Sequence, residues 1–317
     1  MNTTAALIVR RIGVAALTLL LVSAVVFVIT SLLPGDAAQE ALGQSATPEM
    51  IAALRTQLGL DQPAYLRYLH WLFGMLSGDA GQSMANNRPV SELISLRLPK
   101  SLLLAGAAAV VSVPVALGLG ILSAMYRGSR LDRALSVITL SMIAVPEFLV
   151  ATVAVLIFAV KLHWLSALSY VPDSPTLGEF LRAYAMPVMT LCFVIVAQMA
   201  RMTRAAVIDQ LGQSYVEMAI LKGVSPTRAV LAHALPNAIG PIANAVALSL
   251  SYLLGGAIIV ETIFNYPGIA SLMVDAVTNR DMPLLQACAM IFCCAYLALV
   301  LLADVCAIAS NPKLRAR

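Results

Sequence analysis

The sequence predicts an all-α integral membrane protein with six transmembrane helices. Of its 317 residues, 60% are hydrophobic and only 11% are charged, whereas soluble domains are about half apolar and about a quarter charged. The core of a water-soluble protein could not hide this excess, and the same composition excludes a disordered chain. The net charge of +4 is too small for a nucleic-acid-binding surface, so no nucleic acid is expected as a partner.

Six apolar stretches are long enough, or nearly so, for the roughly 20 residues that a helix needs to cross a bilayer. They are residues 12–33, 101–125, 134–160, 183–200, 238–264 and 284–309. The first has an apolar run of roughly 22 residues, whereas the apolar core of a cleaved signal peptide has about 7–15. We therefore expect it to be retained as a membrane helix. The fourth is the shortest, and we expect its helix to continue past Arg201. In the third, Pro146 predicts a local kink with a polar lining beside Glu147.

Lys and Arg are distributed unevenly over the segments that connect these stretches. One alternating set of segments holds Arg10, Arg11, Arg127, Arg130, Arg133, Arg201, Arg204, Lys222, Arg228, Lys313, Arg315 and Arg317. The other set, without the long segment between the first two stretches, holds only Lys161, Arg182 and Arg280. That segment is left out because long loops cross the membrane largely regardless of their charge. Short cytoplasmic loops carry an excess of Lys and Arg. The pattern therefore predicts that both termini are cytoplasmic.

The long segment between the first two stretches is predicted to contain short helices. Thr47 as a cap, Pro48 at the first position and Glu49 in the first turn are typical of a helix start. A second helix, over about residues 63–76, has its apolar residues on one face: Tyr65, Leu69, Leu72, Phe73 and Leu76. Tyr68 and Trp71 favour a position against the membrane surface. The alternative is a small cap packed on the helix bundle.

Motifs for nucleotide, metal and covalent chemistry are missing from the sequence. None of the four lysines follows a glycine, so there is no phosphate-binding loop, and we expect a chain that is not itself an ATPase. His70, His163 and His233 are scattered without metal-ligand spacing. The five cysteines form no Cys-x-x-Cys pair and lie in apolar stretches, so we predict neither disulfides nor a metal site. No cofactor is expected.

Three acidic residues fall within the apolar stretches: Glu147, Glu261 and Asp304. A carboxylate at the centre of a membrane helix costs roughly 2.5–3.5 kcal/mol, so each should face protein or water. As candidates for a pathway or gate, they would serve a stand-alone secondary transporter or channel. As hydrogen-bonding groups near a membrane boundary, they would only hold helices together, which is the interpretation we favour.

Residues 201–237 are too long for a plain connection between neighbouring membrane helices. Their pattern predicts two short helices, of which the first ends at Gly223 in a left-handed conformation. Ser225 can cap the second, Pro226 takes its first position, and Pro236 is expected to end it. A compact helical hairpin on the inner face, in a chain without an ATP site, favours a docking site for another protein.

This segment resembles the EAA loop of the membrane subunits of binding-protein-dependent ABC importers. That pattern is Glu-Ala-Ala, three residues, Gly, nine residues, an apolar residue, any residue, and Leu-Pro. The matching positions are Glu217, Met218, Ala219, Gly223, His233, Leu235 and Pro236. The spacing is kept throughout, although Met218 replaces the second alanine and His233 replaces the apolar residue.

Motifs elsewhere resemble the dipeptide, oligopeptide and nickel branch of these importers. They are Leu33-Pro34-Gly35-Asp36, Leu58-Gly59-Leu60-Asp61-Gln62-Pro63, Gly78-Asp79, Arg88-Pro89-Val90, Arg97-Leu98-Pro99, Gly255-Gly256, Val260-Glu261-Thr262, Pro267-Gly268 and Arg280-Asp281-Met282-Pro283. Met282 stands where a tyrosine is common. The long segment after the first stretch is similar to that of the first of the two paired permease subunits.

The resemblance implies a type I ABC importer permease fold in the bacterial inner membrane. Residues 1–33 would form the cytoplasmic N-terminus and first helix, 34–96 a periplasmic loop, 97–310 the transmembrane core with the coupling loop 201–237, and 311–317 a cytoplasmic tail. Glu217, Ala219, Gly223, His233, Leu235 and Pro236 would couple the chain to its ATPases.

The implied partners are a second homologous permease, two cytoplasmic ATP-binding subunits, the lipid bilayer, and a periplasmic or lipid-anchored solute-binding protein. The chain would form half of the pathway for peptides or a related small solute, such as a nickel chelate, glutathione or an opine-like conjugate. The stand-alone transporter or channel is the alternative function. A membrane enzyme or a receptor-like scaffold is a third class.

Overall fold

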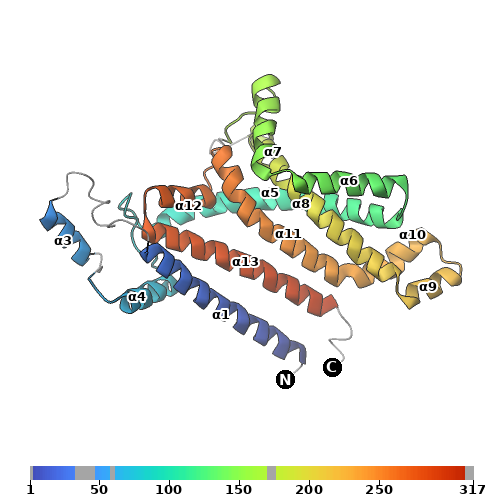
Figure 1. Ribbon diagram of the computed structural model, residues 1–317, viewed down its shortest axis with the longest axis horizontal. Coiled ribbons are helices and arrows are strands. Elements are labelled where there is room, and N and C mark those ends of the chain that lie inside the picture. Colours follow the sequence, from blue (N-terminus) through green and yellow to red (C-terminus); the bar gives the residue numbers. More distant parts are fainter. Residues whose placement is uncertain (1–2, 33–46, 58–60, 170–175, 311–317) are drawn as a thin grey trace. The chain divides into compact units, whose positions relative to one another are not determined.

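The computed structural model describes residues 3–32, 47–57, 61–169 and 176–310, and in these ranges the regular elements are helices (Figure 1). The prediction of an all-α protein is therefore confirmed. The motif at residues 33–36, residues 58–60 of the second motif and the tail 311–317 lie outside the described residues.

Within the described residues, five helices are long and apolar enough to cross a membrane, and a bent pair can form a sixth span. The five are α1 (Thr3–Ser31), α5 (Val90–Met125), α8 (Leu177–Leu211), a continuous helix (Pro226–Ile263) that ends in α11 (Leu235–Ile263), and α13 (Met282–Ser310). The bent pair consists of α6 (Arg130–Ala144), followed by α7 (Glu147–Ala154) and its π-helical extension η1 (Val155–Lys161). Each of the six apolar stretches thus coincides with helix.

The third stretch is not one continuous helix, because its two halves meet at an angle of 94°. Val145, the residue before Pro146, has extended backbone angles (φ −86°, ψ 125°), as steric conflict with the proline ring favours. A new helix then starts, with the Pro146 carbonyl accepting hydrogen bonds from the amides of Leu149 (3.0 Å) and Val150 (3.2 Å). The predicted kink is therefore a complete break between α6 and α7.

Two membrane helices begin earlier than their apolar stretches. α5 starts at Val90, inside the segment expected to be loop, because the Pro89 carbonyl accepts from the amide of Glu92 at 3.1 Å. α8 starts at Leu177 behind a capping box, in which Thr176 and Glu179 each bond the other's backbone amide. Its other end, at Leu211, confirms the expected continuation past Arg201. Polar residues at helix ends thus extend helices beyond the apolar runs.

The chain divides into two compact units, of which the first comprises Met1–Gly13, Leu102–Tyr266 and Tyr296–Arg317. α8 is its central helix, and α6, α7 and α11 pack against it. The side chains of α8 that face these neighbours, including Met186 and Met199, are fully buried. α8 is therefore the scaffold on which the connection to the next helices is built.

The second unit comprises Val14–Ser101 and Pro267–Ala295. It contains α3 (Pro48–Gln57), α4 (Ala64–Ser77) and α12 (Ile269–Thr278), a short helix that the sequence analysis did not predict. The hydroxyl of Thr47 accepts from the amide of Met50 at 3.3 Å, which confirms the predicted helix start. The buried carboxylate of Asp281 accepts hydrogen bonds from the Ser83 hydroxyl and the Met84 amide and so ties two distant segments together.

Candidate functional site

The segment that follows α8 folds into a small helical projection, which we call the knob (residues 212–234). α9 (Ser214–Leu221) is joined through a tight turn to α10 (Pro226–Arg228) and the π-helical η2 (Ala229–Ala234). Val216 of α9 is fully buried against Ala229 and Ala234. The predicted pair of short helices is present, and apolar packing holds it together.

The turn after α9 is a Schellman motif centred on Gly223. Gly223 has φ +88°, its amide donates to the Ile220 carbonyl at 2.9 Å, and the Val224 amide donates to the Ala219 carbonyl at 3.1 Å. These two bonds define the motif, and they satisfy carbonyls that the helix end leaves open. The predicted left-handed conformation of Gly223 is confirmed. Ala219 takes part in the turn through its backbone carbonyl.

The start of the second knob helix also follows the prediction in part. Ser225 occupies the cap position with extended backbone angles, and Pro226 takes the first helical position. The Ser225 side chain makes no capping hydrogen bond.

The expectation that Pro236 ends the second helix is wrong. The chain stays helical from Pro226 to Ile263, and α11 follows η2 without a break. Through η2 the helix is wider than an α-helix, and the Leu235 amide donates to the carbonyl of Val230, five residues back. Pro236 directly follows this wider turn, which accommodates a residue that has no backbone N–H to donate.

The outer surface of the knob combines one acid with apolar side chains. Glu217 is exposed and has no side-chain partner among the described residues. Met218 and Leu221 are also exposed, the latter at 75%. Exposed apolar residues gathered in one place are typical of a surface that another molecule covers.

The other three predicted coupling residues lie at the base of the knob. His233 and Leu235 are half-buried where η2 passes into α11, and Pro236 is exposed. The His233 carbonyl accepts from the Asn237 side-chain amide at 2.9 Å. The six residues therefore divide into an outer group, Glu217, Ala219 and Gly223, and a basal group.

A buried ion pair beside the knob was missed by the sequence analysis. The Arg204 guanidinium on α8 donates from Nε to Asp132 Oδ1 (2.7 Å) and from Nη2 to Asp132 Oδ2 (2.9 Å). The same carboxylate accepts from the Ser123 hydroxyl (2.5 Å) and the Gly128 amide (2.9 Å). A single carboxylate thus joins α5, the turn after it, α6 and α8.

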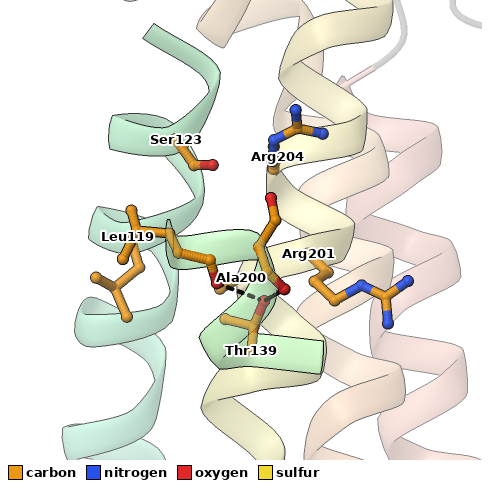
Figure 2. Close-up of a pocket in the computed structure, with 8 residues that line it drawn as sticks. Leu119, Ser123, Thr139, Ala200, Arg201 and Arg204 are labelled. Carbon is orange, nitrogen blue, oxygen red and sulfur yellow. Dashed lines mark hydrogen bonds between the residues drawn. The ribbon is translucent and has the colours of Figure 1, made fainter. Parts of the chain in front are cut away.

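Figure 2 shows the neighbourhood of this ion pair, with Ser123 on α5, Thr139 on α6 and Arg204 on α8 around a pocket of about 20 Å³. Such a volume holds about one water molecule, so the three helices are closely packed here. Arg204 lies about two turns before the end of α8 at Leu211. The ion pair therefore fixes the part of α8 from which the knob projects.

The three acids of the apolar stretches lie in different surroundings. Asp304 on α13 pairs with Arg11 on α1 at 3.2 Å. The Glu147 carboxyl lies against Gly256 of α11, where a Cβ would come within 2.5 Å of its Oε1 atom. Glu261, in the last turn of α11, is fully buried. Asp304 thus links α13 to α1 through an ion pair, and Gly256 makes room for Glu147.

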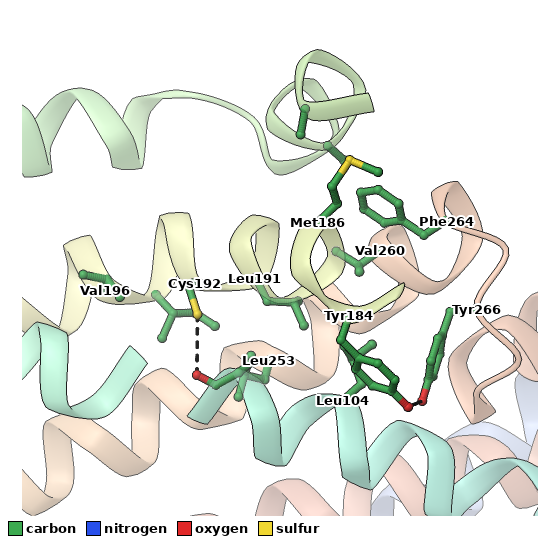
Figure 3. Close-up of a cluster of buried hydrophobic side chains, with 14 of the residues drawn as sticks. Leu104, Tyr184, Met186, Leu191, Cys192, Val196, Leu253, Val260, Phe264 and Tyr266 are labelled. Carbon is green, nitrogen blue, oxygen red and sulfur yellow. Dashed lines mark hydrogen bonds between the residues drawn. The ribbon is translucent and has the colours of Figure 1, made fainter. Parts of the chain in front are cut away.

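Glu261 follows Val260, a fully buried member of the apolar core of the first unit. Its carbonyl accepts from the Tyr266 amide at 2.8 Å. Figure 3 shows the Tyr266 hydroxyl pointing at that of Tyr184 on α8, at 2.7 Å, and both residues belong to the same buried cluster as Phe264 and Val260. This end of α11 is held to α8 by polar as well as apolar contacts.

The five cysteines are free, and in the described residues no group of His, Cys, Asp and Glu is arranged to hold a metal ion. Cys192 and Cys288 are buried, whereas Cys294 is exposed on α13. An exposed cysteine on an apolar helix suits a surface in contact with lipid or another apolar helix.

Comparison with known proteins matches the chain to two family descriptions. Residues 116–316 match the binding-protein-dependent transport system inner membrane component, and residues 5–105 match the N-terminal region of such membrane components. The chain belongs to this family. The glutathione transport system permease proteins GsiC of Escherichia coli (strain K12) and of Salmonella typhi are each 38% identical to it over 299 residues, covering 94% of this chain and 95% of theirs.

The chain is therefore a permease subunit of an ABC importer of the inner membrane, as the motifs suggested. Permeases of this family are not themselves enzymes, and they work with membrane partners and ATPase subunits. Family membership favours the importer over a stand-alone secondary transporter or channel.

Proposed function

We propose that this chain is one of two paired permeases of an importer for glutathione or short peptides. The observation that carries the coupling role is the knob, on which Glu217 and exposed apolar residues are presented by a rigid turn. The solute class is supported by the near full-length similarity to permeases named for glutathione transport.

The remaining partners follow from the EAA resemblance. A second homologous permease supplies the other half of the pathway, two ATP-binding subunits dock on the knobs, and a periplasmic or lipid-anchored protein delivers the solute. Closure of the ATPases on ATP brings the two knobs together and turns the pathway outward. This chain then contributes Glu217, Ala219 and Gly223 to the docking surface, with His233, Leu235 and Pro236 beneath it.

The proposed topology has six spans in a type I fold, with the α6–α7 pair as the broken third span. Both termini and the knob lie in the cytoplasm, and the segment containing α3 and α4 lies in the periplasm. The Lys and Arg distribution supports this orientation, because the knob carries Lys222 and Arg228. It also puts the knob on the side where ATP is available.

The surroundings of two of the three acids, Asp304 and Glu261, argue against a role in coupling to an ion gradient. Asp304 is neutralised by Arg11, and Glu261 is fully buried near the end of its helix. A gradient-driven carrier needs an acid that exchanges its ion with both sides of the membrane. Helix packing accounts for the positions of Asp304 and Glu261.

The test is uptake into proteoliposomes that contain the complete transporter and its binding protein. We expect radiolabelled glutathione or dipeptides to accumulate only when ATP is supplied to the ATPase side, and the purified chain alone to hydrolyse no ATP. Uptake of nickel chelates but not of peptides would contradict the solute class. Uptake driven by a proton or sodium gradient without ATP would contradict the importer mechanism itself.

A further inference from the structure

α4 carries an apolar stripe that its own unit leaves uncovered. Tyr65, Leu69, Phe73 and Leu76 are exposed by 66%, 41%, 65% and 75%. Their spacing of three or four residues puts them on one face of the helix. With 14 residues, α4 is too short to span a bilayer, which takes about 20.

A second face of α4 packs on α1. The hydroxyl groups of Tyr68 and Ser23 share a hydrogen bond of 2.8 Å, and the rings of Tyr68 and Trp71 lie 5.4 and 6.0 Å from the ring of Phe27. Figure 1 shows α4 beside the end of α1 that is far from the N-terminus. α4 is therefore fixed to a helix that crosses the membrane.

The contact lies close to the end of α1. Phe27 lies about one turn, or about 6 Å, before the last residue of α1, Ser31. Interfacial helices bury their apolar face to a depth of about 5–10 Å. Tyr and Trp are enriched at the same level, because their rings are apolar and their tips polar.

The remaining face of α4 is polar and exposed. His70 and Ser77 are accessible there, and α4 contains no acidic residue. Arg67 is half-buried and places its guanidinium 6.0 Å from the ring of Phe27. A helix with one apolar face, one polar face and a basic residue is typical of the membrane–water interface.

We propose that α4 lies in this interface, with the stripe formed by Tyr65, Leu69, Phe73 and Leu76 among the lipid acyl chains. The occupant of the face is lipid, because α4 packs on a membrane helix that itself has apolar and exposed side chains over the same turns, at Val25, Val28, Ile29 and Leu32. The proposal rests only on the transmembrane position of α1.

Spin labels on single cysteines test this in the complete transporter, in nanodiscs of phosphatidylethanolamine and phosphatidylglycerol. In a cysteine-free chain, labels at Phe73 and Leu76 report on the stripe, labels at His70 and Ser77 on the polar face, and a label at Val25 on lipid. We expect Phe73 and Leu76 to be accessible to oxygen and protected from a water-soluble nickel reagent, like Val25. His70 and Ser77, within a turn of the stripe, should be accessible to nickel.

Two results would overturn the proposal. Accessibility of Phe73 and Leu76 to nickel would place the stripe in water. Protection of both labels from oxygen as well as nickel would mean that a protein covers it. The Val25 label is the control for the membrane position of α1. If α1 did not cross the membrane, the Val25 label would also be accessible to nickel.

Discussion

Replacing Gly223 with valine should uncouple ATP hydrolysis from solute uptake while leaving the permease assembled in the membrane. Gly223 has φ +88°, and a Cβ there would meet no atom within 4 Å. The cost is therefore one of backbone conformation, about 1 kcal/mol or more, and greater for a β-branched residue. Relaxing the turn changes the angle between α9 and α10, so that the knob no longer fits its ATPase. Uptake and hydrolysis measured in the same proteoliposomes should show hydrolysis without transport, or a loss of bound ATPase.

Two variants serve as controls for this prediction. Gly212→Val lies at the other end of α9, where φ is −79° and the nearest atom to a Cβ is at 3.7 Å, and it should transport normally. Gly223→Asn should recover much of the activity, because asparagine tolerates the left-handed conformation. Equal activity of Gly223→Val and the wild type would show that the turn is not part of the coupling.

Glu217→Lys should give a similar defect by a different route. Glu217 has no side-chain partner in the described part of the chain, so the substitution should not change the stability of the fold. If the acid is buried against a partner, reversing its charge costs several kcal/mol of interface energy, and at the rim it costs little. Wild-type uptake with normal ATPase retention would show that the knob is only a solvated connector.

Breaking the buried ion pair should cause the largest loss of stability. Asp132→Ala leaves the half-buried Arg204 guanidinium, the Ser123 hydroxyl and the Gly128 amide without their shared acceptor. Removing one member of a buried pair typically costs about 3–5 kcal/mol. We expect a marked fall in the Tm of the purified transporter, together with weaker ATPase binding, because the pair fixes α8 close to the knob.

The chain offers a matched exposed pair. Arg88 and Glu92 lie 2.6 Å apart, with side chains 50% and 48% exposed, against 31% and 6% for Arg204 and Asp132. Glu92→Ala should therefore cost less than about 1 kcal/mol. The double variant Asp132→Ala with Arg204→Met should be more stable than Asp132→Ala alone, because it removes the uncompensated charge. Equal Tm values for Asp132→Ala and Glu92→Ala would refute this account of the ion pair.

The sequence predicts the membrane helices and the Gly223 turn because each depends on local information. Twenty apolar residues can cross a bilayer wherever they occur, and a glycine after a short amphipathic helix needs no distant partner to adopt positive φ. The long extension of α8 was predictable from the shortness of its apolar stretch. The cap at Thr176 and Glu179, a local signal, would have given its start.

The features that sequence reasoning missed depend on distant contacts. Asp132 and Arg204 are separated by 72 residues, and the pattern around Ser129 and Asp132 shows only that a helix starts there. The 94° break at Pro146 and the continuous helix through Pro236 illustrate the same limit. A proline alone does not reveal whether packing will open the chain, or whether a π-helical turn will absorb the missing hydrogen bond.

The most direct test of the coupling mechanism is crosslinking from the knob. In a cysteine-free chain within the complete transporter, a single cysteine at Leu221 is compared with one at Val110 on α5, since both native side chains are 75% exposed. A short bifunctional reagent should join Leu221→Cys to the cytoplasmic ATP-binding subunit, and Val110→Cys should give no such product. Docking through the knob would be contradicted by two results together. Leu221→Cys would form no crosslink, and it would react with a water-soluble thiol reagent equally fast with and without the ATPases.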